Sequence, residues 1–205
     1  MSEFTPKGLV FCVSGPSGVG KGTIIAELRK ITPSIIHSIS VTTRQPRPGE
    51  MDGIHYYFRQ PDEFQQMMAQ GEILEHDSYC GNFYGTPRKP LIEATEQGRD
   101  VLMDVTVPGS LAVMENFPDA ITLFLLPPSF TELRRRLTKR GTENPEVVEK
   151  RLQKAREEIE KARLFQYVVV NDDIQITARK ILSIAEAERC RYERMAGVEK
   201  LIMSK

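Results

Sequence analysis

Short apolar runs recur along the chain, and segments with apolar residues at helical spacing separate them. Four runs have the length of buried strands and lie at residues 9–13, 100–104, 120–125 and 167–170. After the first run, one helix face is marked by Ile24, Ile25, Leu28 and Ile31. Strands that alternate with helices favour an α/β fold with a central parallel sheet between two layers of helices. Such a sheet binds its ligand at the carboxyl ends of its strands.

Other segments complete the predicted element order. An apolar run at 35–41 predicts a further strand. Residues 56–84 form a small unit that reads as an insertion, with a short strand at 56–58, a helix at 61–69 and irregular chain at 71–85. Residues 174–195 predict one long closing helix. The tail that follows keeps a helical spacing, and the sequence leaves open whether it packs on its own domain or on a second copy in a homo-oligomer.

The first strand leads into a glycine-rich loop that predicts phosphate binding. The loop is Gly15-Pro16-Ser17-Gly18-Val19-Gly20-Lys21-Gly22-Thr23. Glycines allow positive φ, so successive N–H groups turn into one concavity, and the next helix points its positive dipole end there. Lys21 adds a full charge at the transferring phosphates. A hydroxyl is expected directly after the lysine, but Gly22 stands there and Thr23 follows, so we expect water at that Mg²⁺ coordination position.

Charge and composition exclude several partners. The 205 residues carry 28 basic and 28 acidic side chains, which leaves no global field for nucleic acid or an anionic membrane. One domain with a small insertion fits this length. The three cysteines are widely spaced, and neither a signal peptide nor a membrane-spanning run is present. We therefore expect a cytoplasmic protein with reduced thiols.

Arginines gather in two places where they would hold anions. Arg44 and Arg47 lie on a proline-rich extended segment, where their planar guanidinium groups would clamp a dianion; a solvated loop is the alternative interpretation. Arg136, Arg140 and Arg151 lie beside apolar helix stripes, whereas neighbouring arginines point away. The segment 141–145 between their helices would act as the hinge of a lid. A carboxylate at the end of a buried strand, Asp104, is the candidate that orders Mg²⁺.

Taken in order, these motifs resemble the guanylate kinase family over roughly residues 8 to 190. The matching pieces are Ser14–Gly18 with Gly20-Lys21, Ser40–Arg44 with Pro46–Glu50, Gly53 and Tyr56, Gly81–Pro87, Pro127–Ser129, Arg140–Thr142 and Val169–Asp173. The resemblance implies phosphoryl transfer from ATP to GMP with Mg²⁺, in purine nucleotide metabolism, with dGMP as a further acceptor. It also implies a P-loop core at 1–40, 88–136 and 157–205, a GMP-binding insertion at about 41–87 and a lid at about 137–156.

The resemblance assigns roles to individual residues. It implies that the GMP phosphate is held by Ser40, Arg44, Arg47, Tyr56 and Tyr84. Glu75 and Thr86 would recognise guanine, and Asn171 would contact the ATP base. Adenine would leave Glu75 unpaired, at a cost of about 1–3 kcal/mol or more.

This chain departs from the family pattern after Asp104. A second acidic residue followed by Gln-Gly is usual there, but Thr106 and Pro108-Gly109 occupy these places. Either Glu75 carries more of the guanine recognition, or base discrimination is looser. Two other functions stay open: a guanylate-kinase-like module that binds a phosphopeptide without catalysis, and a kinase that acts on another phosphorylated acceptor. An intact phosphate loop disfavours the first.

Overall fold

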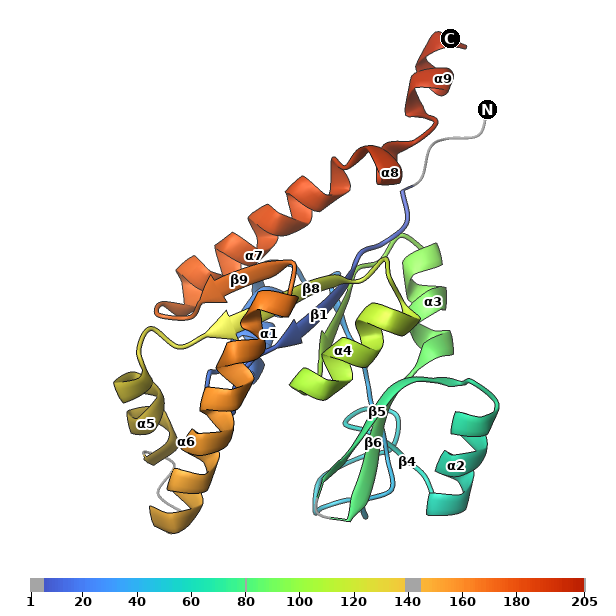
Figure 1. The fold of residues 1–205 in the computed structure, drawn as a ribbon. Helices are drawn as coiled ribbons and strands as arrows, with labels where there is room; N and C mark the ends of the chain where they lie inside the picture. Colours follow the sequence, from blue (N-terminus) through green and yellow to red (C-terminus); the bar gives the residue numbers. More distant parts are fainter. Residues whose placement is uncertain (1–5, 80, 139–144, 205) are drawn as a thin grey trace.

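A five-stranded parallel sheet forms the centre of the molecule (Figure 1). The structure is a computed structural model that describes residues 6–79, 81–138 and 145–204. In spatial order the strands are β2 (Ile36–His37), β7 (Val101–Asp104), β1 (Val10–Ser14), β8 (Ile121–Leu126) and β9 (Tyr167–Val170). All five residues of β1 are buried, as expected for a strand covered on both faces. The predicted α/β fold is confirmed.

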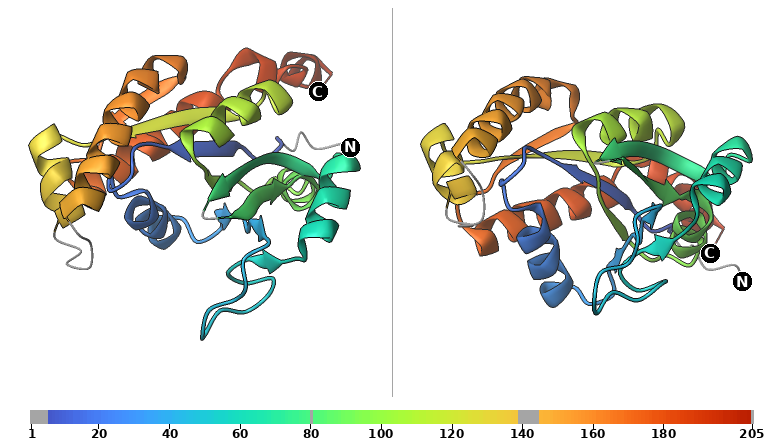
Figure 2. Two further views of the ribbon diagram at one scale, coloured as in Figure 1. Left: turned by 60° about the horizontal axis from the view of Figure 1, so that its bottom comes forward. Right: turned by 90° about the horizontal axis from the view of Figure 1, so that it is seen from below.

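Helices cover the two faces of this sheet (Figure 2). Helices α1 (Lys21–Ile31) and α7 (Ile174–Arg189) share one apolar cluster with β1, β8 and β9. Helices α3 (Arg88–Glu96) and α4 (Val107–Asn116) contribute Leu91 and Val113 to a second cluster against β1 and β7. The result is three layers, with apolar helix stripes turned toward the sheet.

The residues that lie between β2 and β7 in the chain form a smaller mixed sheet, with the strand order β4-β3-β6-β5. Its elements are β3 (Val41–Thr42), β4 (Tyr57–Phe58), α2 (Pro61–Ala69), β5 (Ile73–Tyr79) and β6 (Asn82–Pro87). Helix α2 begins where predicted, because Gln60 and Glu63 form a capping box and Pro61 takes the first helical position. It buries Phe64 against Val41 and Ile73.

Three sequence-based boundaries are wrong. Residues 71–85 are not irregular, because β5 and β6 pair there as an antiparallel hairpin. The run at 35–41 is not one strand, because β2 belongs to the central sheet and β3 to the smaller one. The helix predicted at 174–195 stops at Arg189, and a separate helix α8 (Tyr192–Met195) follows. This break lets Arg191 and Arg194 both pair with the buried carboxylate of Glu188.

Two further helices lie on the opposite side of the molecule from the small sheet (Figure 1). They are α5 (Phe130–Thr138) and α6 (Pro145–Glu160), which pack through Leu133, Leu137, Val148 and Leu152. A 3₁₀ turn (Lys161–Leu164) leads from α6 to β9. Past α8, helix α9 (Val198–Met203) extends away from the central sheet (Figure 1).

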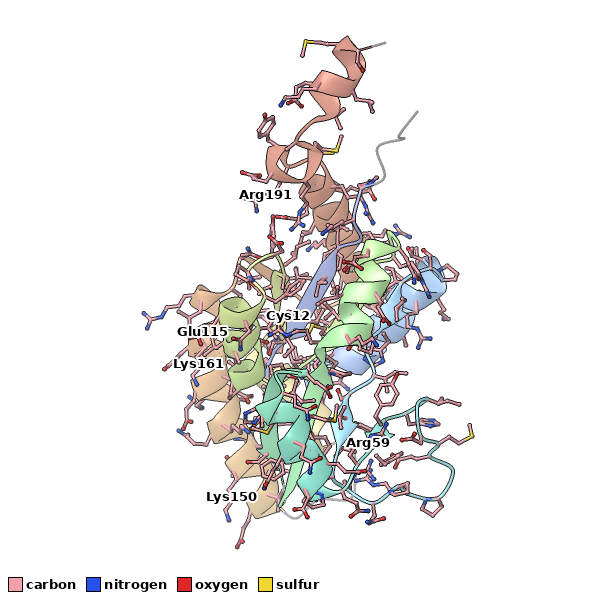
Figure 3. All side chains as sticks on the ribbon, turned by 90° about the vertical axis from the view of Figure 1, so that its right-hand side faces the viewer. Cys12, Arg59, Glu115, Lys150, Lys161 and Arg191 are labelled. Atoms are coloured by element: carbon pink, nitrogen blue, oxygen red, sulfur yellow. The ribbon has the colours of Figure 1, made fainter. Side chains whose placement is uncertain are left out.

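Cys12 lies in the interior, whereas Arg191 lies toward the C-terminal segment (Figure 3). Burial raises the pKa of the Cys12 thiol to about 12, so this thiol is not a reactive nucleophile. None of the helices in the described ranges combines the length and the apolar character needed to cross a bilayer.

Candidate active site

The phosphate loop connects β1 to α1 and leaves the start of that helix open. Gly20 is the N-cap with φ 101°, and the first turn of α1 holds no acidic residue. A Cβ on Gly20 would lie 2.8 Å from Asn171 Nδ2, and a Cβ on Gly15 would lie 2.5 Å from the Leu125 carbonyl oxygen. Both positions therefore require glycine for backbone conformation and for space. The uncompensated helix N-terminus leaves the loop electrostatically suited to an anion.

Lys21 reaches back over the loop toward the strand-end carboxylate. Its Nζ donates a hydrogen bond to the Gly15 carbonyl at 3.2 Å and lies 3.9 Å from Asp104 Oδ1. Burial raises the pKa of Asp104, and the nearby charges of Lys21 and His37 oppose that rise. The predicted pair of cation and carboxylate therefore meets at the carboxyl end of β7, beside the loop.

Side chains from distant elements hold the loop from outside. Asn171, which follows β9, is buried and donates from Nδ2 to the Val19 carbonyl at 2.7 Å. Arg136 of α5 donates to the carbonyls of Val19 and Asn171 at 3.1 and 3.2 Å and pairs with Glu132 at 2.8 Å. In this arrangement Arg136 ties α5 to the loop through backbone oxygens. Asn171 Oδ1 is buried and has no hydrogen-bond partner among the described residues.

Helix α6 also contacts the loop. Arg151 Nη2 donates to Ser17 Oγ at 2.7 Å, so one of the predicted lid arginines reaches the phosphate loop. Arg134 is exposed and pairs with Glu149, and so points away as predicted. Arg140 and the hinge residues 141–144 lie outside the described residues. The predicted roles of Arg140 and of the hinge therefore stay predictions.

A cleft of about 320 Å³ opens between the central sheet and the small sheet. Its lining residues are Ser40, Tyr56, Glu75, Asp77, Tyr84, Gly85, Asp104, Val105 and Thr106. Asp104 therefore lines this cleft and also lies beside Lys21 of the phosphate loop. The two predicted anion sites are neighbours that share one carboxylate.

Glu75 is the buried acid of this cleft. It is 7% exposed, and its Oε1 accepts a hydrogen bond from Thr86 Oγ1 at 2.6 Å. Burial raises the pKa of Glu75, and the hydrogen bonds from Thr86 oppose that rise. A Cβ on Gly109 would lie 2.5 Å from Glu75 Oε2, so this glycine leaves the room that the carboxylate occupies. The Thr86 hydroxyl donates its single hydrogen to Glu75. To donate to guanine O6, the hydroxyl would have to rotate and give up this hydrogen bond.

Arg44 is held in place by a carboxylate that the sequence analysis did not single out. Its two terminal nitrogens each lie 2.9 Å from an oxygen of Glu50, and its guanidinium carbon lies 5.3 Å from the Tyr56 ring centroid. The Arg44 side chain and the Arg47 backbone N–H lower the pKa of Glu50 to about 2. The Tyr56 and Tyr84 rings stand edge to face, 6.1 Å apart. Arg44 is thus preoriented beside the cleft, while Arg47 is exposed.

Two other carboxylates were missed. Asp77 lines the cleft beside Thr106, and its signal in the sequence was its position two residues after Glu75, which places both on one face of a strand.

Glu158 of α6 lies next to the phosphate loop and has a buried Oε2 without a partner in the described part of the chain. Burial raises the pKa of Glu158, while the neighbouring lysines Lys154 and Lys21 oppose the rise. No local sequence motif identified Glu158, because its helix carries several solvent-exposed acids.

Comparisons with known proteins agree with this geometry. A family model described as guanylate kinase matches residues 7–188. A guanylate kinase of Desulfitobacterium hafniense (strain Y51) is 49% identical over 187 residues, which cover 91% of this chain and 94% of the relative. A guanylate kinase of Symbiobacterium thermophilum is 48% identical over 189 residues, 92% of this chain and 90% of the relative. A crystal structure of guanylate kinase from Anaplasma phagocytophilum superposes with a TM-score of 0.78 at 35% identity, covering 99% of this chain and 97% of that one.

Proposed function

We propose, from the premise that this chain belongs to the guanylate kinase family, that it transfers the γ-phosphoryl group of ATP to GMP and releases ADP and GDP. The observation that carries the proposal is the shared position of Asp104. This carboxylate lines the cleft of Glu75 and Tyr84 and lies 3.9 Å from Lys21 of the phosphate loop. A triphosphate in the loop and a monophosphate in the cleft would therefore meet end to end.

The reaction needs positioning and charge neutralisation more than proton transfer. The attacking group is a phosphate oxygen of GMP, which is mostly ionised at neutral pH because the second phosphate pKa is about 6. The residues proposed to neutralise the transferring group are Lys21, Arg44 and the lid arginines Arg136, Arg140 and Arg151. In this role Arg136 would exchange its present carbonyl partners for phosphate oxygens. Asn171 Oδ1, an acceptor without a partner among the described residues, suits an adenine amino group.

The GMP side is proposed to divide between phosphate and base. Ser40, Arg44, Arg47, Tyr56 and Tyr84 would hold the phosphate, because they offer cationic and hydroxyl donors around the cleft mouth. Glu75 would accept hydrogen bonds from guanine, with Thr86 orienting it. Glu50 pairs with Arg44 in this structure, so a phosphate would compete with that carboxylate for the same guanidinium fork.

Asp104 fits a Mg²⁺ ion held through water. Its carboxylate is a hard oxygen ligand, one-third exposed, at the boundary of the two sites. Gly22 supplies no hydroxyl ligand, so we propose a water in the place that a loop hydroxyl would take. When bound, Mg²⁺ would supply positive charge that neutralises the phosphate groups during transfer.

The proposal extends to how and where the chain acts. We propose a core, a GMP-binding insertion at about 41–87 and a lid at about 137–156 that closes when both nucleotides are bound. The contact of Arg151 with Ser17 supports a lid within reach of the loop. The cytoplasm is the proposed compartment, because both nucleotide substrates are supplied there.

A coupled assay of ADP release tests the substrate assignment. ATP would be presented with GMP, dGMP, AMP or UMP, and we expect release to be fastest with GMP. Equal rates with all acceptors would overturn the assignment of GMP. A chain that binds GMP but never releases ADP would instead act as a binding module. Lys21→Ala should abolish most of the release, whereas Lys30→Ala, a solvent-exposed lysine on the same helix, should not.

A further inference from the structure

Two carboxylates project from β5 into the same cleft. Glu75 and Asp77 are separated by one residue, so they share a face of the strand, and both line the cleft with Tyr84 and Thr106. Glu75 lies at the inner end, where Gly109 leaves room for its Oε2. Asp77 lies farther along the strand and is half-buried. The cleft therefore holds a second acceptor group beside the one already assigned to guanine.

Thr106 fixes the position of this second carboxylate. The Thr106 side chain caps α4 by accepting a hydrogen bond from the Gly109 backbone N–H at 3.2 Å. Its own hydroxyl hydrogen is donated to Asp77 Oδ2 at 2.8 Å. The Ser78 backbone N–H donates to Asp77 Oδ1 at 2.7 Å. Both oxygens of Asp77 are thus oriented by donors that do not belong to a ligand.

Position 106 is also where this chain lacks an acid that its motif would lead one to expect. The Asp77 carboxylate accepts a hydrogen bond from the Thr106 side chain. A carboxylate of β5 therefore lies beside the position where the motif would carry its acid at the start of α4. Guanine presents an N1–H and a 2-amino group along one edge, which together offer three hydrogens. Glu75 Oε1 accepts the hydrogen bond from Thr86, and each Asp77 oxygen, which accepts one hydrogen bond, keeps a further acceptor position for a ligand.

We propose that Asp77 is a second specificity-determining residue for the acceptor base, and that it accepts a hydrogen bond from the 2-amino group of guanine while Thr106 positions it. This inference rests on the proposed function. It identifies the acceptor as a purine that carries an amino group on C2 and a hydrogen on N1. Hypoxanthine lacks the 2-amino group, so it would donate no hydrogen bond to the Asp77 carboxylate.

A merely structural tie between β5 and α4 is the competing interpretation of the Asp77–Thr106 hydrogen bond. A tie would support the cleft for any purine monophosphate. Base recognition would instead separate GMP from IMP, because the two nucleotides differ only in the 2-amino group. The ratio of their kcat/KM values therefore distinguishes the two interpretations.

The test compares GMP and IMP as acceptors in the unaltered chain and in Asp77→Ala. We expect kcat/KM for GMP to fall roughly tenfold to a hundredfold while kcat/KM for IMP stays unchanged or rises, because Asp77→Ala also removes the unpaired carboxylate. Asp62→Ala, which removes an exposed carboxylate from α2 in the same small unit, serves as the matched control and should leave both values unchanged. An equal fall for GMP and IMP, or an unchanged ratio, would overturn the proposal.

A compensating variant guards against damage to the fold. Combining Asp77→Ala with Thr106→Asp returns the carboxylate from the α4 side, and we expect the preference for GMP over IMP to return. Calorimetric binding of GMP and IMP should follow the same order without turnover. If the unaltered chain transfers no phosphoryl group to GMP, the proposed function fails; if it does, and the variant keeps its preference, only the role of Asp77 fails.

Discussion

Burial of Glu75 gives one residue a measurable effect on stability. Because burial raises its pKa, the folded state holds the proton more readily than the unfolded state does. The buried charge of Glu75 lowers the free energy of unfolding. This effect is absent below the unfolded pKa of about 4.3 and fully present above the higher folded pKa. The free energy of unfolding is therefore lowered by this group as pH rises through that window. The proposed recognition of guanine requires an acid at a position where stability would favour a neutral group.

Glu75→Gln should consequently stabilise the chain at neutral pH while it weakens GMP recognition. The amide oxygen keeps an acceptor for Thr86, and the buried charge is gone. We expect Tm to rise by about 1–4 °C at pH 8 and by less near pH 4.5, measured by thermal unfolding. Glu72→Gln, an exposed glutamate just before the same strand, should show no such dependence. A Tm difference that is the same at both pH values would contradict the assignment.

At this scale the sequence predicted residues that stand in recognisable motifs. Lys21, Arg44 and Glu75 could be found because each lies at a fixed place in a glycine loop, a proline-rich segment or a family pattern. Glu50 could not, since its importance depends on the guanidinium of Arg44, and Asp77 offered only its spacing from Glu75, since its importance depends on a hydrogen bond to Thr106. Such pairings are properties of the folded chain.

Among the elements, the start of α1 combines a glycine that should not tolerate replacement with one that should. Gly20 has φ 101°, and a Cβ there would approach Asn171 Nδ2 at 2.8 Å, whereas a Cβ on Gly22 meets nothing within 4 Å. Gly20→Ala should lower the free energy of unfolding by about 1–3 kcal/mol and weaken ATP binding. Gly22→Ala should raise it by about 0.5–1 kcal/mol, because alanine favours the helix.

Denaturant unfolding with calorimetric ATP binding checks both variants. If Gly20→Ala proved as stable as Gly22→Ala and bound ATP equally well, the loop would not depend on the left-handed conformation that the structure gives it.

The helical pair α5 and α6 is the element proposed to act during the transfer step. Arg151→Ala removes the α6 side chain that reaches Ser17, so we expect kcat to fall by roughly tenfold or more while the Kd of GMP changes little. Arg134→Ala is the matched control, since that arginine is exposed and pairs with Glu149. Steady-state kinetics with GMP titration measures both. An unchanged kcat in Arg151→Ala would remove α6 from the catalytic machinery.

Element boundaries were predictable where a strand or helix is defined by burial. The strands of the central sheet are apolar because both faces are covered, and α2 carries its own capping signals. The hairpin of β5 and β6 was missed because one of its faces lines the cleft with Glu75, Asp77 and Tyr84, which removes the alternation of apolar residues. The end of α7 was missed because no glycine or proline marks it, and ion pairs to Glu188 favour the break.

At the scale of the whole molecule, the two proposed binding sites adjoin at one carboxylate. The phosphate loop belongs to the central sheet, and the cleft is completed by the small sheet, so Asp104 at the end of β7 borders both. The order of motifs predicted the family, which the comparisons confirm, and the two sites stay predictions. The contacts of Arg136 and Asn171 with the loop required the folded structure, because more than 110 residues separate Arg136 from Val19 in sequence.

Binding of a bisubstrate ligand tests the meeting of the two sites most directly. Adenosine and guanosine joined by five phosphates would be titrated into the chain by calorimetry, beside ATP and GMP alone. We expect one ligand per chain, bound at least a hundredfold more tightly than either nucleotide, because linking the two makes the second contact intramolecular. Lys21→Ala and Arg44→Ala should each weaken it. Affinity no greater than that of ATP alone, or insensitivity to Arg44→Ala, would contradict two adjoining nucleotide sites.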